Sequence, residues 1–107
     1  MTCTKIHKLK ILDNRLNQLI KTKIGNAVYS DIRIHYLHCK CIVRLLEHSF
    51  RYFKISINTP EPEGDVCKVE FIVEINDTTK YIKTLTFELY DNPNIWDCIG
   101  WRLVQER

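Results

Sequence analysis

Apolar and polar positions in the first half of the chain repeat with the period of an α-helix. Between Ile6 and about Ile24, leucines recur at alternating steps of three and four residues, which predicts an amphipathic helix. Gly25 and Asn26 then predict its end. A helix this short needs a partner surface to be stable, so we interpret residues 1–25 as an amphipathic helical arm. Its apolar stripe consists of Leu9, Leu12, Leu16 and Leu19.

A second and more apolar helix is predicted after this arm. Ser30 or Asp31 can cap it at the N-terminus, and the helical pattern continues to about Phe50 or Arg51. Its apolar positions cover more than half of the helix circumference, which leaves only a narrow polar strip. A helix of this kind is central to a core or shared with another chain.

Beyond the second helix the period changes to two, which is the period of a β-strand. Alternating apolar residues predict three strands near residues 52–58, 66–76 and 80–90. An acidic loop at 58–65, with two prolines and a glycine, and a short polar turn connect them. Lys83 interrupts the alternation of the third strand. Short links between consecutive strands predict an antiparallel meander.

The last part of the chain is predicted to form a helix, with Asn92 as its cap and Pro93 in its first turn. Trp101 falls on the opposite side of this predicted helix. There it is either an exposed anchor for a partner or a cover for the open sheet edge or the first helix within the same domain. The apolar face contains Ile95, Trp96, Ile99 and Leu103.

The predicted fold is therefore α+β: two N-terminal helices, a three-stranded antiparallel meander and a C-terminal helix, in the order α-α-β-β-β-α. The helices are expected to cover one face of the sheet. Residues 1–107 are predicted to form a single domain, with 26–107 as its globular α+β part. The predicted core contains Phe53, Ile55, Val69, Phe71, Val73, Leu85, Phe87, Ile95 and Ile99.

The segment HYLHCKC, residues 35–41, has the composition of a metal site. Histidines and cysteines one helical turn apart can bind zinc, and His48 or Cys67 could complete four ligands. The alternative interpretation is a buried helix, because Cys39 and Cys41 fall on the apolar arc, where a free cysteine behaves as a small hydrophobe. Structural zinc sites usually contain a Cys-x2–4-Cys pair, which this chain lacks. We therefore predict a core helix, with no metal and no cofactor.

Charge is unevenly distributed along the chain. Residues 1–54 contain eleven Lys/Arg and three Asp/Glu, hence +8, whereas residues 55–107 contain five and ten, hence −5. A basic helical stripe can follow phosphates, so nucleic-acid binding is the alternative function. The residues that would carry it are Lys21, Lys23, Arg33, Lys40, Arg44 and Arg51.

Catalytic signatures are not found in the sequence. No glycine-rich turn, nucleophile elbow or oxyanion loop accompanies the cysteines and histidines, so the chain is not predicted to be an enzyme. No segment approaches the ~18 apolar residues of a membrane span, and no membrane partner is expected. The five cysteines are an odd number, and the N-terminus lacks the pattern of a signal peptide. We therefore expect reduced thiols and a cytoplasmic or nuclear location.

These patterns favour a non-enzymatic protein–protein interaction or scaffold module. The second helix has more apolar surface than one sheet face covers, and the two oppositely charged halves could align a contact. The module is expected to self-associate as a homo-oligomer, with the arm as a short coiled coil, or to pair with another chain in a hetero-complex. The contact residues predicted are Leu9, Leu12, Leu16 and Leu19, with Trp101 as a second anchor.

Overall fold

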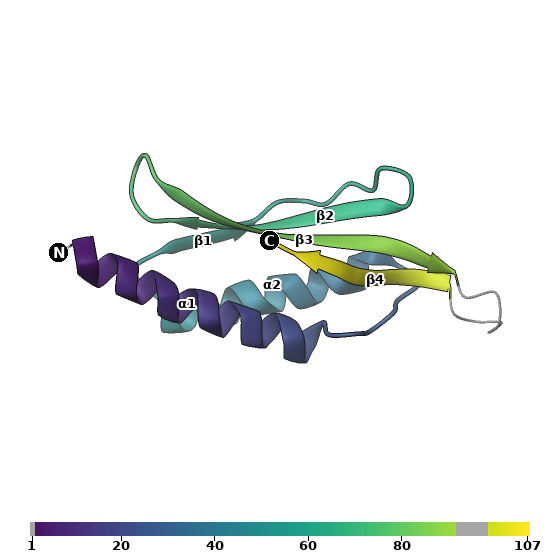
Figure 1. Cartoon of the computed structure of the whole chain (residues 1–107), viewed down its shortest axis with the longest axis horizontal. Helices are drawn as coiled ribbons and strands as arrows, with labels where there is room; N and C mark the ends of the chain where they lie inside the picture. Colours follow the sequence, from purple (N-terminus) through teal and green to yellow (C-terminus); the bar gives the residue numbers. More distant parts are fainter. Residues whose placement is uncertain (1, 92–98) are drawn as a thin grey trace.

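The protein has two layers, a pair of helices and an antiparallel sheet (Figure 1). The structure, a computed structural model, describes residues 2–91 and 99–107. Both helices lie on the same face of the sheet, and the strands follow one another in sequence order. The elements are α1 (Thr2–Lys23), α2 (Ile32–Ser49), β1 (Lys54–Ile57), β2 (Val66–Glu74), β3 (Lys80–Asp91) and β4 (Ile99–Glu106).

Both helices begin and end close to the predicted positions. Gly25 follows α1 with a φ of 48°, the left-handed conformation that favours glycine after a helix. Its N–H donates to the Ile20 carbonyl at 3.0 Å. Asp31 caps α2 by accepting from the backbone N–H of Arg33 at 2.9 Å. These two caps explain why the helical pattern stops and starts where it does.

The three predicted strands are confirmed as β1, β2 and β3, but the predicted C-terminal helix is wrong. Residues 99–106 form a fourth strand, so the order is α-α-β-β-β-β. The predicted start of that helix, including Asn92, Pro93, Ile95 and Trp96, lies outside the described residues.

The prediction failed because residues 99–106 fit both the helical period of 3.6 residues and the strand period of two. Ile99 and Leu103 are four residues apart, as on a helix, but Trp101 and Leu103 also alternate with Gly100 and Arg102, as on a strand. Pairing with β3 decides between the two, because it satisfies backbone groups that would otherwise form an open edge. Gly100 also suits this position, since a Cβ there would lie 2.6 Å from the Tyr29 carbonyl oxygen.

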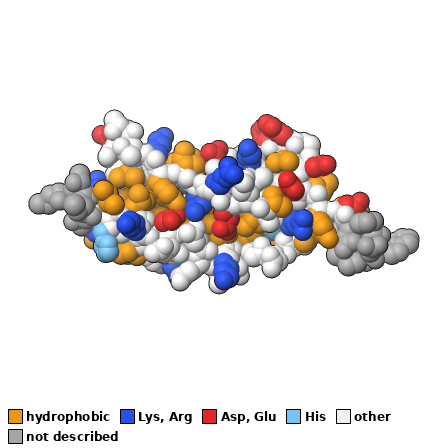
Figure 2. Space-filling model, in the orientation of Figure 1, with side chains coloured by type: hydrophobic (Ala, Val, Ile, Leu, Met, Phe, Trp, Pro, Cys, Tyr) orange, Lys and Arg blue, Asp and Glu red, His pale blue; other side chains and the backbone are white. Residues whose placement is uncertain are grey.

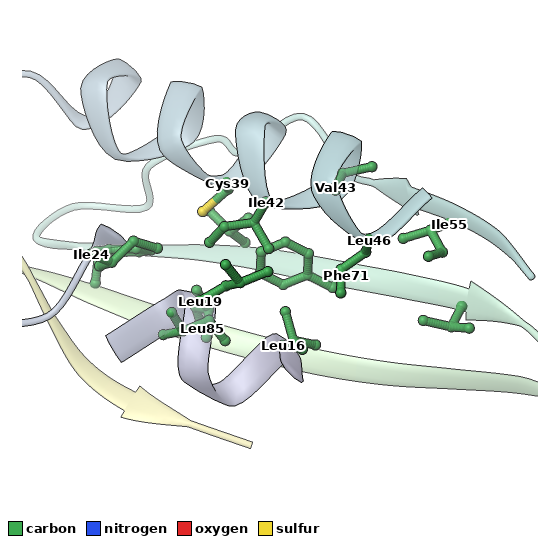
Figure 3. Close-up of a cluster of buried hydrophobic side chains, with 14 of the residues drawn as sticks. Leu16, Leu19, Ile24, Cys39, Ile42, Val43, Leu46, Ile55, Phe71 and Leu85 are labelled. Carbon is green, nitrogen blue, oxygen red and sulfur yellow. The ribbon is translucent and has the colours of Figure 1, made fainter. Parts of the chain in front are cut away.

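The core lies between the helices and the sheet. Figure 3 shows Ile42 and Leu46 of α2 and Leu16 of α1 converging on Phe71 of β2. Ile99 is 55% exposed, so its predicted place in the core is wrong, and Ile95 lies outside the described part of the chain. The other predicted core residues are confirmed as buried: Phe53, Ile55, Val69, Phe71, Val73, Leu85 and Phe87.

Lys83 interrupts the apolar alternation of β3 because it has a partner on α1. Its ammonium lies 3.5 Å from Asp13 Oδ1, and the Tyr81 hydroxyl donates a hydrogen bond to the same oxygen. Burial, and then the hydrogen bond to the Asp13 carboxylate, raise the pKa of Tyr81, so its hydroxyl stays protonated as a donor. The Lys83 ammonium on the inner face of the sheet therefore has a counter-charge, which offsets the cost of its burial.

Candidate functional site

The leucine stripe of α1 faces the chain's own core. Leu12 and Leu16 are fully buried, Leu19 is 5% exposed, and Leu9 is partly buried against the same cluster. The predicted contact surface of the helical arm is thus covered by α2 and the sheet within one chain. Little of it is accessible to a second protein.

Trp101 was predicted either as an exposed anchor or as a cover within the domain, and its exposed fraction on β4 of only 8% agrees with the second. Its backbone N–H donates to the Tyr29 carbonyl at 2.7 Å, and its carbonyl accepts from the Tyr29 N–H at 3.2 Å. This bridge attaches the segment between the helices to the edge of β4. The strand conformation turns the indole toward the helices, where a helix would have turned it outward.

The HYLHCKC segment lies in α2 and is divided between two faces. His35 is fully buried, and its Nε2 donates to the Trp101 carbonyl at 2.7 Å. Burial lowers the pKa of His35, although the hydrogen bond to Trp101 opposes this. Cys39 is buried, whereas Cys41 and Leu37 are exposed. Across residues 2–91 and 99–107, no group of three or more His, Cys, Asp or Glu is placed to hold a metal.

A row of apolar side chains remains exposed on the opposite side of α2 from the core. Ile34 is 37%, Leu37 60% and Leu45 39% exposed, and Cys41 is an exposed free thiol between them. Their spacing of three, four and four residues aligns them along the helix, and we call these four residues the α2 stripe. The sequence indicated surplus apolar surface on this helix, because apolar positions cover more than half of its circumference. It did not identify these four residues as contact residues.

A row of basic side chains flanks the α2 stripe. Arg33, Lys40 and Arg44 are all exposed, with spacings of seven and four residues, and we call them the α2 basic ridge. Arg33 forms an ion pair with Asp31 at 2.7 Å. Within the described chain, Lys40 and Arg44 have no carboxylate within 4.0 Å. Their charges are therefore available to a partner.

The other basic residues predicted for nucleic acid do not belong to this ridge. Lys21 lines a groove beside β4, Lys23 is half-buried, and Arg51 is exposed beyond the end of α2. On the face presented in Figure 2, Lys/Arg and Asp/Glu side chains are interspersed. On this face, the basic half of the sequence thus does not form one uniform basic surface.

The groove beside Lys21 has a volume of about 840 Å³ and lies between the C-terminal part of α1 and the edge of β4. Leu103 and Val104 form its β4 wall, and Asn17 and Ile20 contribute from α1. An open strand edge can accept another strand. However, the β3–β4 ladder shifts its register between Thr86 and Phe87, and such irregularities bend an edge away from regular pairing. The α2 stripe is the better candidate for a contact.

The chain was compared with known proteins and tested for membrane-spanning helices. Neither helix of the described part is long and apolar enough to cross a membrane. No protein-family model, curated protein or solved structure matches this chain.

Proposed function

We propose that the protein is a non-enzymatic protein–protein interaction module whose contact face is the α2 stripe. One observation carries the proposal: α2 buries one apolar face in the core and still exposes a second apolar row. Aligned exposed apolar side chains favour association, because covering them removes apolar surface from water. The proposed location is a reducing compartment, cytoplasm or nucleus, because an odd number of cysteines does not suit a complete disulfide framework.

Site-specific photo-crosslinking tests the contact face. A photoreactive phenylalanine analogue replaces Leu37 in the full chain, produced in the cells that naturally contain it. Illumination should yield discrete protein adducts, identified by mass spectrometry, that a non-photoreactive Leu37→Phe chain does not give.

The matched control carries the same analogue in place of Ile11, an exposed apolar residue on α1. Adducts from position 11 should be absent or different. If position 37 gives no adduct, or both positions give the same pattern, the α2 stripe is not the contact face.

Nucleic-acid binding is the second candidate, and the α2 basic ridge supports it. If the ridge contacts phosphates, retention on RNA or DNA should decrease linearly in a log–log plot against salt. Lys40→Glu with Arg44→Glu should abolish retention, while Lys54→Glu with Lys68→Glu, both exposed on strands, should weaken it less. The absence of binding to either polymer at low salt would end this candidate.

A further inference from the structure

We infer that the occupant of the α2 stripe is an acidic amphipathic helix from another protein. This inference rests on the proposed function and specifies the chemistry of the partner. It combines the exposed apolar row with two cations on one flank of it, Lys40 and Arg44, neither of which has a carboxylate partner among the described residues.

The backbone of α2 explains why the occupant is a helix. Within α2, backbone groups bond to one another, so the stripe offers only side chains. An extended segment lying on it would leave its own N–H and C=O groups without partners on an apolar surface. A helix satisfies these groups internally and can pack its apolar ridge along the row. The row from Ile34 to Leu45 corresponds to about 16 Å, so roughly three turns of a partner would cover it.

The basic ridge explains why the partner is acidic. Residues 32–49 contain three Lys/Arg and a single acid, Glu47. Of these three cations, only Arg33 has an ion-pair partner among the residues described. Glutamates on the matching flank of a partner helix would meet Lys40 and Arg44 at the rim of the contact. Such pairs set orientation and association rate more than affinity.

The same charges disfavour an antiparallel packing of two copies of this chain. If two α2 helices packed antiparallel about a two-fold axis, the α2 basic ridge of one would lie beside that of the other. Lys40 and Arg44 would then oppose like charges. A membrane surface is also a poorer fit, because interfacial helices present a broad cationic face around the apolar one, whereas these cations occupy one flank.

A pair of designed peptides tests the inference on the full chain. Both have the same three-turn leucine row, one flanked by glutamates and the other by lysines. Fluorescence anisotropy should show the glutamate peptide binding roughly tenfold or more tightly at low salt, with the difference shrinking as salt screens the charges. Lys40→Glu with Arg44→Glu should reverse the preference. The control Lys54→Glu with Lys68→Glu changes the net charge equally and should leave it intact.

Each other outcome has a defined meaning. If the two peptides bind equally, or if neither binds, the inference of an acidic helical partner is wrong. If the photoreactive analogue at position 37 gives no protein adducts in cells, the proposed function itself is wrong. A dimer in sedimentation equilibrium that Leu37→Glu dissociates identifies a second copy as the occupant. Leu37-dependent binding to vesicles of anionic phospholipid identifies a membrane. Both results would refute the inference.

Discussion

Both helices carry apolar rows, but α2 is the more apolar of the two, and the rows differ in what covers them. The leucine row of α1 is buried by α2 and the sheet, so α1 presents mainly polar residues to solvent. By contrast, α2 buries Cys39, Ile42 and Leu46 on one side and exposes the α2 stripe on another. The regular heptad-like row, which looked most like a partner-binding element, is core. The broadly apolar helix α2, predicted as core, also exposes apolar side chains to solvent.

The largest expected effect is a difference in alkylation rate between two cysteines that lie on different faces of α2. Burial raises the pKa of Cys39 to about 12, whereas an ordinary thiol has a pKa of about 8.5, so the reactive thiolate of Cys39 is more than a thousandfold scarcer. Cys41, two residues away, is exposed. Iodoacetamide should therefore modify Cys41 at least a thousandfold faster in the folded protein, as measured by peptide mapping over time. Comparable rates would mean that the two faces are not distinct.

Alanine substitutions should separate the row of α1 from the row of α2. Leu16→Ala removes a fully buried side chain and should lower the free energy of unfolding by about 2–5 kcal/mol. Leu37→Ala removes a side chain that is 60% exposed and should change it by no more than about 0.5 kcal/mol. Urea unfolding of both variants provides the measurement. A large loss in Leu37→Ala would show that the α2 stripe packs within the chain.

The polar contact of α1 with the sheet should have an intermediate effect. Asp13→Asn leaves the Lys83 ammonium, whose side chain is 13% exposed, without a counter-charge. It should cost about 1–3 kcal/mol, and adding Lys83→Met should recover part of this loss. The control Asp31→Asn retains a capping residue and disrupts only the exposed ion pair with Arg33, so its loss of stability should be much smaller, because solvent screens an exposed pair. Equal losses in thermal or urea unfolding would contradict the inward placement of Lys83.

The smallest expected effect is a pH dependence that originates on the buried face of α2. Because burial holds the pKa of His35 below its ordinary value of about 6.5, folding favours the neutral ring. Its contribution to stability is complete above that value and is lost as the pH falls through the lower pKa of the folded state. The urea midpoint should therefore decrease below about pH 6.5.

This pH dependence should weaken in His35→Gln and persist in His48→Gln, because His48 is exposed on the same helix. An unchanged slope in His35→Gln would exclude His35 as the source.

The sequence alone was sufficient to predict both helices, the first three strands and most of the core residues. Repeats of 3.6 and of two residues predict which side of an element is buried, and Phe71 and Leu85 follow this rule. Caps at Gly25 and Asp31 could be predicted because their geometry is local. The break at Lys83 was visible, but its partner Asp13 is distant in sequence and could not be identified.

Only the tertiary structure decided what each apolar face contacts. Residues 99–106 fit a helix and a strand equally, and the edge of β3 selected the strand, which buried Trp101. The row containing Leu12 and Leu16 had to be covered, but a pattern within one helix does not specify whether its own chain or another covers it. That choice depends on the packing of distant elements. The same packing left Leu37 exposed beside Lys40, because one sheet and one neighbouring helix cannot surround α2 on every side.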